Sequence, residues 1–136
     1  MEATWVYFMA RLCTCVLWAA TGTYNAFHYR ETTLKMAQNH VPWPEYLLVP
    51  VLVMKFGGSL MMITNQYVWA AALVWSVYLI PVSLLFHLPF YDEEGKFIFP
   101  QMIQFSKNVS LIGGLLTLVL LDPSKPQWLN ALLHQI

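Results

Sequence analysis

The chain has 136 residues, of which 58% are hydrophobic and 10% are charged, and its formal net charge is zero. Soluble domains carry roughly 25% charged residues, so this composition excludes an ordinary soluble domain. Zero net charge also excludes the basic surface that nucleic-acid-binding proteins need, and we expect no nucleic-acid partner.

Four apolar blocks follow one another, each about 20 residues long, which is the length of a helix that crosses a bilayer. The predicted spans cover residues 4–27, 46–64, 67–88 and 101–121. These blocks lack the polar face that helices of a soluble bundle show. They predict an all-α fold, a four-helix transmembrane bundle in a single domain of residues 1–136. We expect a multi-pass integral protein in the lipid bilayer of a bacterial or organellar inner or cytoplasmic-type membrane.

The first block is interpreted as a span and not as a secretory signal peptide. A signal peptide has a basic start and a short apolar core. Here Met1-Glu2 gives no positive charge at the side chains, and Arg11 interrupts a long apolar run.

The connecting segments also carry patterns. Residues 28–45 mix charged and apolar side chains and predict an interfacial segment, either a surface helix or a re-entrant turn, closing with an extended Pro42-Trp43-Pro44. Residues 92–96 predict a hairpin-like turn, and residues 123–136 a short amphipathic tail that lies on the membrane or on a neighbour. The apolar face of that tail is formed by Trp128, Leu129, Leu132, Leu133 and Ile136.

Four spans place both termini on one side of the membrane and the long loops, residues 28–45 and 89–100, on the other. The basic residues of these loops are Arg30, Lys35 and Lys96. The opposite side carries Lys125. Cytoplasmic loops are enriched in Lys and Arg, so this small bias favours a cytoplasmic location for the long loops.

Three cations lie inside the predicted spans, Arg11, Lys55 and Lys107, and no Asp or Glu does. A lysine at mid-membrane costs about 2.5–3.5 kcal/mol, so a counter-charge or polar ligand must offset it. We expect no such group from the chain's own helices. It would come from an anionic or oxygen-rich small molecule, with a quinone or a bound lipid as candidates, or from other membrane subunits. Arg11 and Lys107 need no such partner if their side chains extend to the membrane surface. Lys55 needs none if its amine is uncharged.

Other polar residues are expected at the end of the bundle that carries the long loops, because adjacent spans run antiparallel. They are Asn25, His28, His87, Lys107 and Asn108. Their convergence favours a site for a cofactor or partner, and Arg11 and Lys55 are further candidate residues for such binding. A histidine near a span end is more often structural than a ligand, so we predict neither a metal site nor a catalytic residue.

Two glycine pairs interrupt otherwise bulky helices. Gly57-Gly58 lies in the second span and Gly113-Gly114 in the fourth. Small residues let helix backbones approach closely in membranes, so both pairs predict helix packing.

The stretch His87-Leu88-Pro89-Phe90, followed by a polar loop and the run from Phe105 to Leu116, resembles the DoxX family of small four-helix membrane proteins. That family's fourth helix carries a lysine–asparagine pair and then a glycine pair, as Lys107-Asn108 and Gly113-Gly114 do here. The pattern is also met by Arg11, Gly22, Val41-Pro42 and Gly57-Gly58. One position departs from it, since Lys55 stands where the family often has a glutamate.

The resemblance implies a membrane partner of redox systems, because one branch is similar to the large subunit of thiosulfate:quinone oxidoreductase. On that basis Arg11, Lys55, His87 and Lys107 would bind a quinone or a sulfur oxyanion through charge and hydrogen bonds.

From the residues themselves we favour an accessory or structural subunit of a larger membrane complex. That this complex is redox or energy-converting in kind is what the resemblance implies. The chain shows no metal motif and no Cys-x-x-Cys, so we expect no catalytic activity of its own. The alternatives are a DoxX-type subunit of a quinone- or sulfur-compound-linked oxidoreductase, and a small transporter or assembly factor.

Overall fold

The computed structural model describes residues 2–88, 90–92 and 94–133, and over this range the chain is helical apart from short connections. The helices are α1 (Glu2–Phe27), α2 (Tyr29–Gln38), α3 (Pro44–Thr64), α4 (Val68–His87), α5 (Phe99–Leu121) and α6 (Gln127–Leu133). Helices α1, α3, α4 and α5 are long and apolar enough to cross a membrane, which confirms the predicted four-helix transmembrane bundle.

Helices α3 and α5 each begin two residues before the predicted span. Both carry a proline in the first turn, Pro44 in α3 and Pro100 in α5. Proline fits there because its missing N–H would have no partner within the helix.

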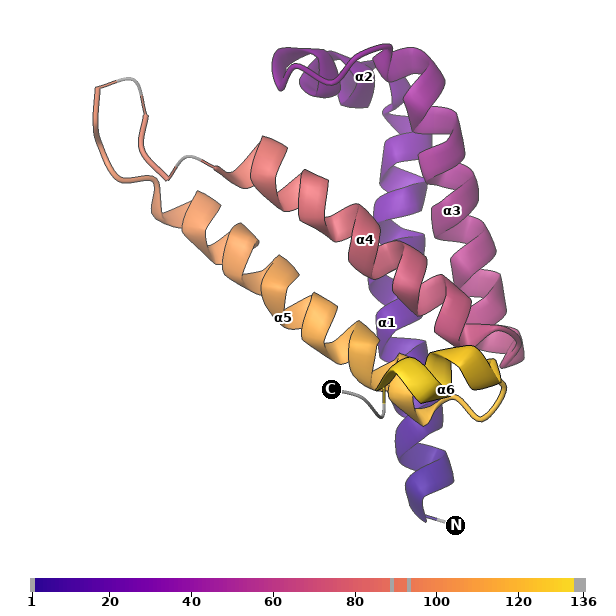
Figure 1. Cartoon of the computed structure of the whole chain (residues 1–136). Coiled ribbons are helices and arrows are strands. Elements are labelled where there is room, and N and C mark those ends of the chain that lie inside the picture. The colour runs from indigo at the N-terminus through magenta and orange to yellow at the C-terminus, as the bar shows by residue number, and fades with distance from the viewer. Residues whose placement is uncertain (1, 89, 93, 134–136) are drawn as a thin grey trace.

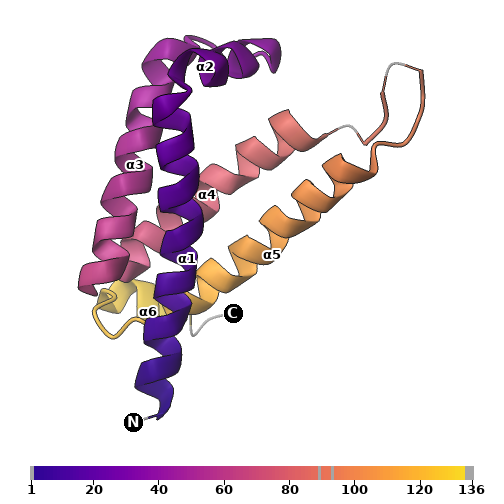
Figure 2. The same ribbon diagram turned by 180° about the vertical axis from the view of Figure 1, so that it is seen from behind.

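The four long helices form two antiparallel pairs, α1 with α3 and α4 with α5, and the members of each pair lie side by side (Figure 1, Figure 2). A tight turn joins α3 to α4, with positive φ at Asn65 (57°) and Tyr67 (53°). The pairs lie together at the end that carries α6 and diverge toward the end that carries α2 (Figure 1). We call these the closed and the open end.

Two tryptophans fill the interior between the pairs. Trp18 of α1 stacks on Trp75 of α4, with ring centroids 4.4 Å apart and 14° between the planes. Trp75 Nε1 donates a hydrogen bond to the Met54 carbonyl at 3.3 Å. Gly58 of α3 lies against the same ring, since a Cβ there would come within 2.6 Å of Trp75, whereas a Cβ at Gly57 would meet nothing within 4 Å. Close packing on a glycine therefore occurs at Gly58.

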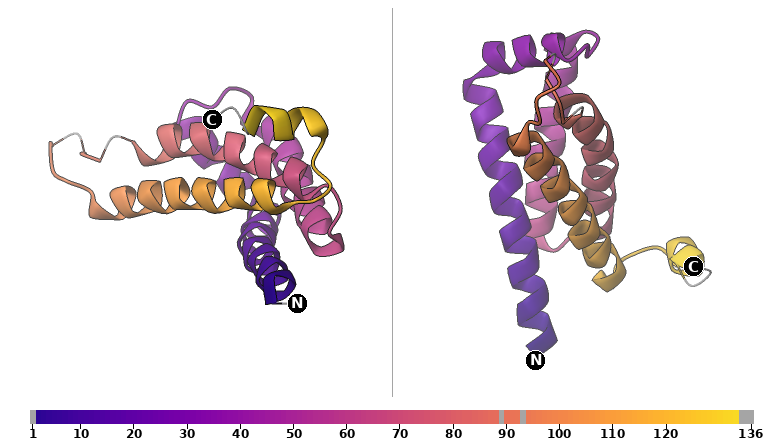
Figure 3. Two further views of the ribbon diagram at one scale, coloured as in Figure 1. Left: turned by 60° about the horizontal axis from the view of Figure 1, so that its bottom comes forward. Right: turned by 90° about the vertical axis from the view of Figure 1, so that its left-hand side faces the viewer.

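Helix α2 lies across the open end and packs on α3 (Figure 3). The predicted extended Pro-Trp-Pro is wrong, because Trp43 is left-handed, with φ 44° and ψ 56°. Its carbonyl accepts hydrogen bonds from the backbone N–H groups of Tyr46 (3.1 Å) and Leu47 (3.0 Å). The left-handed residue thus turns the chain into α3 and supplies an acceptor to its first turn. The Tyr29 hydroxyl donates to the Glu45 carbonyl and ties α2 to the same place.

The connection between α4 and α5 contains the predicted hairpin-like turn. Asp92 Oδ1 accepts hydrogen bonds from the backbone N–H groups of Glu94 (3.1 Å) and Lys96 (2.8 Å). Gly95 supplies the positive φ, 76°, that the turn requires. This carboxylate is therefore used to hold the turn.

The tail forms α6 against the closed end. Leu129 is buried in the core, and Trp128 meets Trp69 edge to face at 6.3 Å. Trp128 and Leu132 remain exposed. Ile136, expected on the same apolar face, lies outside the described residues.

Candidate functional site

Lys55 lies on α3 with 5% of its surface exposed and faces α1. Its Nζ donates to Thr21 Oγ1 at 3.3 Å. With the Asn25 amide turned to match its neighbours, Nζ also donates to the Asn25 side-chain oxygen at 3.0 Å, and the Asn25 nitrogen donates to the Thr21 carbonyl at 3.2 Å. Gly22 permits this approach, because a Cβ there would stand 3.3 Å from Lys55 Cβ.

This arrangement corrects one expectation. The chain's own helices do supply polar ligands to Lys55, as neutral oxygens of α1. The expectation rests on the lack of acidic residues in the spans, and these neutral ligands are not acidic. A threonine and an asparagine spaced i, i+4 on one helix face were the available signal.

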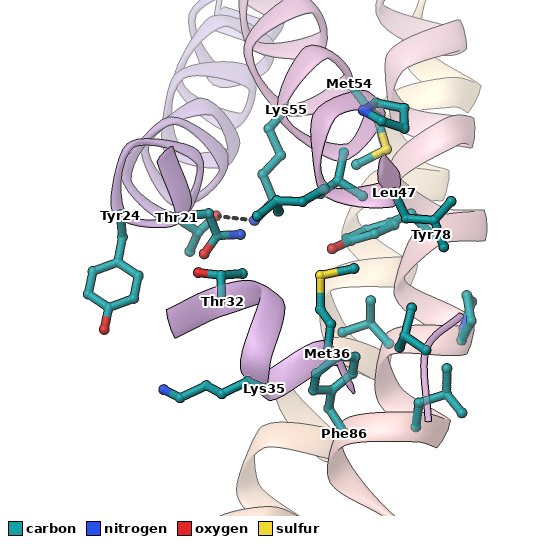
Figure 4. Close-up of a pocket in the computed structure, with 18 of the residues that line it drawn as sticks. Thr21, Tyr24, Thr32, Lys35, Met36, Leu47, Met54, Lys55, Tyr78 and Phe86 are labelled. Carbon is teal, nitrogen blue, oxygen red and sulfur yellow. Dashed lines mark hydrogen bonds between the residues drawn. The ribbon is translucent and has the colours of Figure 1, made fainter. Parts of the chain in front are cut away.

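A cavity of about 830 Å³ opens beside Lys55, between α1, α2, α3 and α4. Its wall is mainly apolar and includes Leu47, Val51, Met54, Val74, Leu85 and Phe86. Figure 4 shows the Lys55 amine and the hydroxyls of Thr32 and Tyr78 turned toward the same space, with Met36 reaching in from α2. The volume lies within the range of about 300–1,000 Å³ that small-molecule sites occupy.

A second cavity, of about 130 Å³, adjoins the first and reaches α5. Lys55 and His87 line both cavities, and Lys107 and Asn108 line the smaller one. Asn108 is buried and donates to Ser83 Oγ at 3.0 Å. His87 Nδ1 lies 2.9 Å from Gln101 Oε1. The structure therefore brings four of the predicted residues around one space, with Asn25 beside Lys55.

Arg11 and His28 do not join this group. Arg11 donates to the Met62 carbonyl at 2.9 Å near the closed end, and its guanidinium lies 4.9 Å from the centroid of the Tyr7 ring. His28 is exposed and stacks on Tyr24 at 4.3 Å. Neither of them lines either cavity. Within the described residues no group of His, Cys, Asp and Glu side chains is arranged to hold a metal ion.

Asp122 is a buried carboxylate that is not among the site residues predicted from the sequence. Its exposed fraction is 2%, and its Oδ2 accepts a hydrogen bond from the backbone N–H of Trp69 at 2.7 Å. Its Oδ1 accepts from both the N–H and the hydroxyl of Ser124 at 2.8 Å. The end of α5 is thereby joined to the first turn of α4, where a negative charge is favoured. An aspartate between an apolar block and a Pro-Ser turn was the signal for it.

The outer face of α5 is a stripe of small residues. Ser106, Ser110, Gly113, Gly114 and Thr117 lie on one side of the helix and are exposed. A Cβ at Gly113 or Gly114 would meet no atom of another helix within 4 Å, so the predicted packing at this pair is not made within the described residues. The buried residues of α5, Asn108, Leu115, Leu118 and Val119, lie on the opposite side.

A family model described as DoxX matches residues 6–88, more than half of the chain. The chain belongs to the DoxX family. The matched region runs from α1 to the end of α4. The lysine–asparagine and glycine run of α5, on which the resemblance partly rested, lies beyond it.

The chain is also similar to the inner membrane protein YphA of Escherichia coli strain K12. The two are 24% identical over 115 residues, which cover 85% of this chain and 81% of YphA. No solved structure matches the chain. The family, this relative and the four apolar helices identify a multi-pass integral membrane protein in a lipid bilayer.

Proposed function

We propose that this DoxX-family protein is an accessory subunit of a larger membrane complex, of the redox or energy-converting kind that the family resemblance implies. In this proposal the outer face of α5 binds a helix of a partner subunit. The observation that carries it is the exposed stripe from Ser106 to Thr117.

Small residues are the usual contact surface between membrane helices, because they let two backbones approach and increase van der Waals contact. Two hydroxyls of the stripe are already hydrogen-bonded and so need no partner from a second helix. Ser110 Oγ donates to the Ser106 carbonyl and Thr117 Oγ1 to the Gly113 carbonyl, both at 3.0 Å. The hydroxyls of Ser110 and Thr117 are therefore satisfied within α5, which suits contact with a second helix.

A cation beside the stripe supports the same assignment. Lys107 is exposed on α5, and its Nζ donates to the side-chain oxygen of Gln104. Among the described residues no carboxylate forms a salt bridge with it. Charged groups within membrane spans commonly pair with one another, so a partner's carboxylate would complete this contact.

The proposal is tested by replacing Gly114 with leucine, which fills the stripe, and replacing Gly57 with leucine as the control. A Cβ at either glycine meets nothing within 4 Å, so the new side chain starts in open space at both positions, and we expect both variants to fold. Tagged protein is extracted in mild detergent and its native mass is measured. We expect wild type and Gly57→Leu to be bound to a partner subunit that is a different membrane protein. We expect Gly114→Leu to bind that partner with about tenfold lower affinity, because overpacking one contact costs about 1–3 kcal/mol.

A wild-type protein that is monomeric, or that associates only with copies of itself, would contradict the proposal. So would a Gly114→Leu variant that retains as much partner as Gly57→Leu does.

A further inference from the structure

We propose that the cavity beside Lys55 binds a long-chain carboxylic acid. The carboxylate pairs with the Lys55 ammonium, and the hydrocarbon chain lies along the apolar wall of the cavity toward α2. This site lies on other helices than the proposed partner face of α5, and neither proposal depends on the other.

The charge of Lys55 is the first argument. An ammonium group has three N–H donors, and Thr21 and Asn25 supply neutral oxygens for two of them. Within the described part of the chain no carboxylate is paired with this amine. A buried ion is stable only when it is paired and hydrogen-bonded, and an anion in the cavity supplies both.

The polar groups around the cavity suit a carboxylate. Figure 4 shows the Tyr78 hydroxyl turned toward the same space as the Lys55 amine, so the cavity offers a carboxylate a second donor. Glu31 and Lys35 line the cavity from α2, and their opposite charges offset each other. Figure 4 also shows Lys35 directed away from Lys55.

The depth of Lys55 in the membrane favours a single-chain acid over a phospholipid as the ligand. Lys55 lies 11 residues after Pro44, the first residue of α3. At about 1.5 Å per residue this is roughly 16 Å along the helix, near the middle of a hydrocarbon core of about 30 Å. A phospholipid headgroup stays at the membrane surface with its two chains below it. The carboxylate of a single chain carries less polar surface to that depth, and the volume of about 830 Å³ holds its chain.

Native mass spectrometry of the purified full-length protein in detergent tests the site. The probes are oleate, oleyl alcohol, decylubiquinone and dioleoylphosphatidylglycerol. We expect oleate to bind about tenfold or more tightly than oleyl alcohol, which has the same chain without the charge, because a hydrogen-bonded ion pair is lost. We also expect oleate to bind more tightly than the quinone or the phospholipid.

Three variants separate the roles of charge and shape. Lys55→Met should abolish the preference for oleate over oleyl alcohol. Lys96→Met removes a lysine from the exposed turn and should bind as wild type does. Val51→Phe places a larger side chain in the cavity while keeping Lys55, and it should weaken the binding of both oleate and oleyl alcohol. This variant tests the site even if Lys55→Met does not fold.

Equal binding of oleate and oleyl alcohol to the wild-type protein would overturn the proposal. Tighter binding of decylubiquinone or of phosphatidylglycerol than of oleate would do the same, since either result assigns the cavity to another ligand class. A Val51→Phe variant that binds both single-chain probes as wild type does would place them outside this cavity.

Discussion

Gly58 of α3 packs directly against the Trp75 ring of α4, between the two helix pairs. The Trp75 ring is fully buried and stacked on Trp18, so it has no room to move away from a new methyl group. A Cβ at position 58 would stand 2.6 Å from that ring. We therefore predict that Gly58→Ala lowers the free energy of unfolding by about 1–3 kcal/mol, as overpacking of a core does.

The matched control for this prediction is Gly57→Ala. Its methyl group meets nothing within 4 Å, and alanine favours a helix over glycine, so its stability should equal or exceed that of wild type. Thermal unfolding in one detergent compares the variants. Equal melting temperatures for Gly58→Ala and wild type would show that the Trp75 ring does not constrain this position.

Single residues were also where the sequence was least informative. It singled out Lys55 because a mid-span charge is conspicuous, but the groups that hold it, Thr21 and Asn25, are neutral and common. Asp122 directly follows the predicted fourth span, and a residue at the edge of an apolar block gives no sign of being buried. Its partner, the backbone of Trp69, lies 53 residues away in sequence.

At the scale of helices, Asp122 joins the end of α5 to the start of α4. We predict that Asp122→Ala lowers the free energy of unfolding by about 1–3 kcal/mol, because the N–H of Trp69 loses its acceptor. Asp122→Asn keeps one side-chain oxygen and should lose less. Thermal unfolding in detergent checks both, and an Asp122→Ala variant as stable as wild type would show that this junction does not support the bundle.

Helices themselves were predicted well, since their lengths follow from apolar blocks that must cross about 30 Å of hydrocarbon. The conformation of Trp43 was not, because a residue before proline usually avoids helical backbone angles. Here the carbonyl of Trp43 meets N–H groups in the first turn of α3 that have no helical partner, and this favours the left-handed form.

The whole molecule is two helix pairs that meet at one end and part at the other (Figure 1). That divergence could not be predicted, because it depends on how Trp18, Trp75 and Gly58 fit together and not on the hydrophobicity of any block. It has two consequences. A cavity opens beside Lys55, and the outer face of α5 is left without a neighbour in the described chain.

The central claim, that α5 binds a partner subunit, is tested most directly by photo-cross-linking in living cells. A photoreactive phenylalanine replaces Ser110 on the stripe, and Val77 as the control, which is 65% exposed on α4. We predict a protein adduct with a different membrane protein from position 110 and none from position 77. The claim is contradicted if position 110 yields no protein adduct, yields only an adduct with a second copy, or yields the same adducts as position 77.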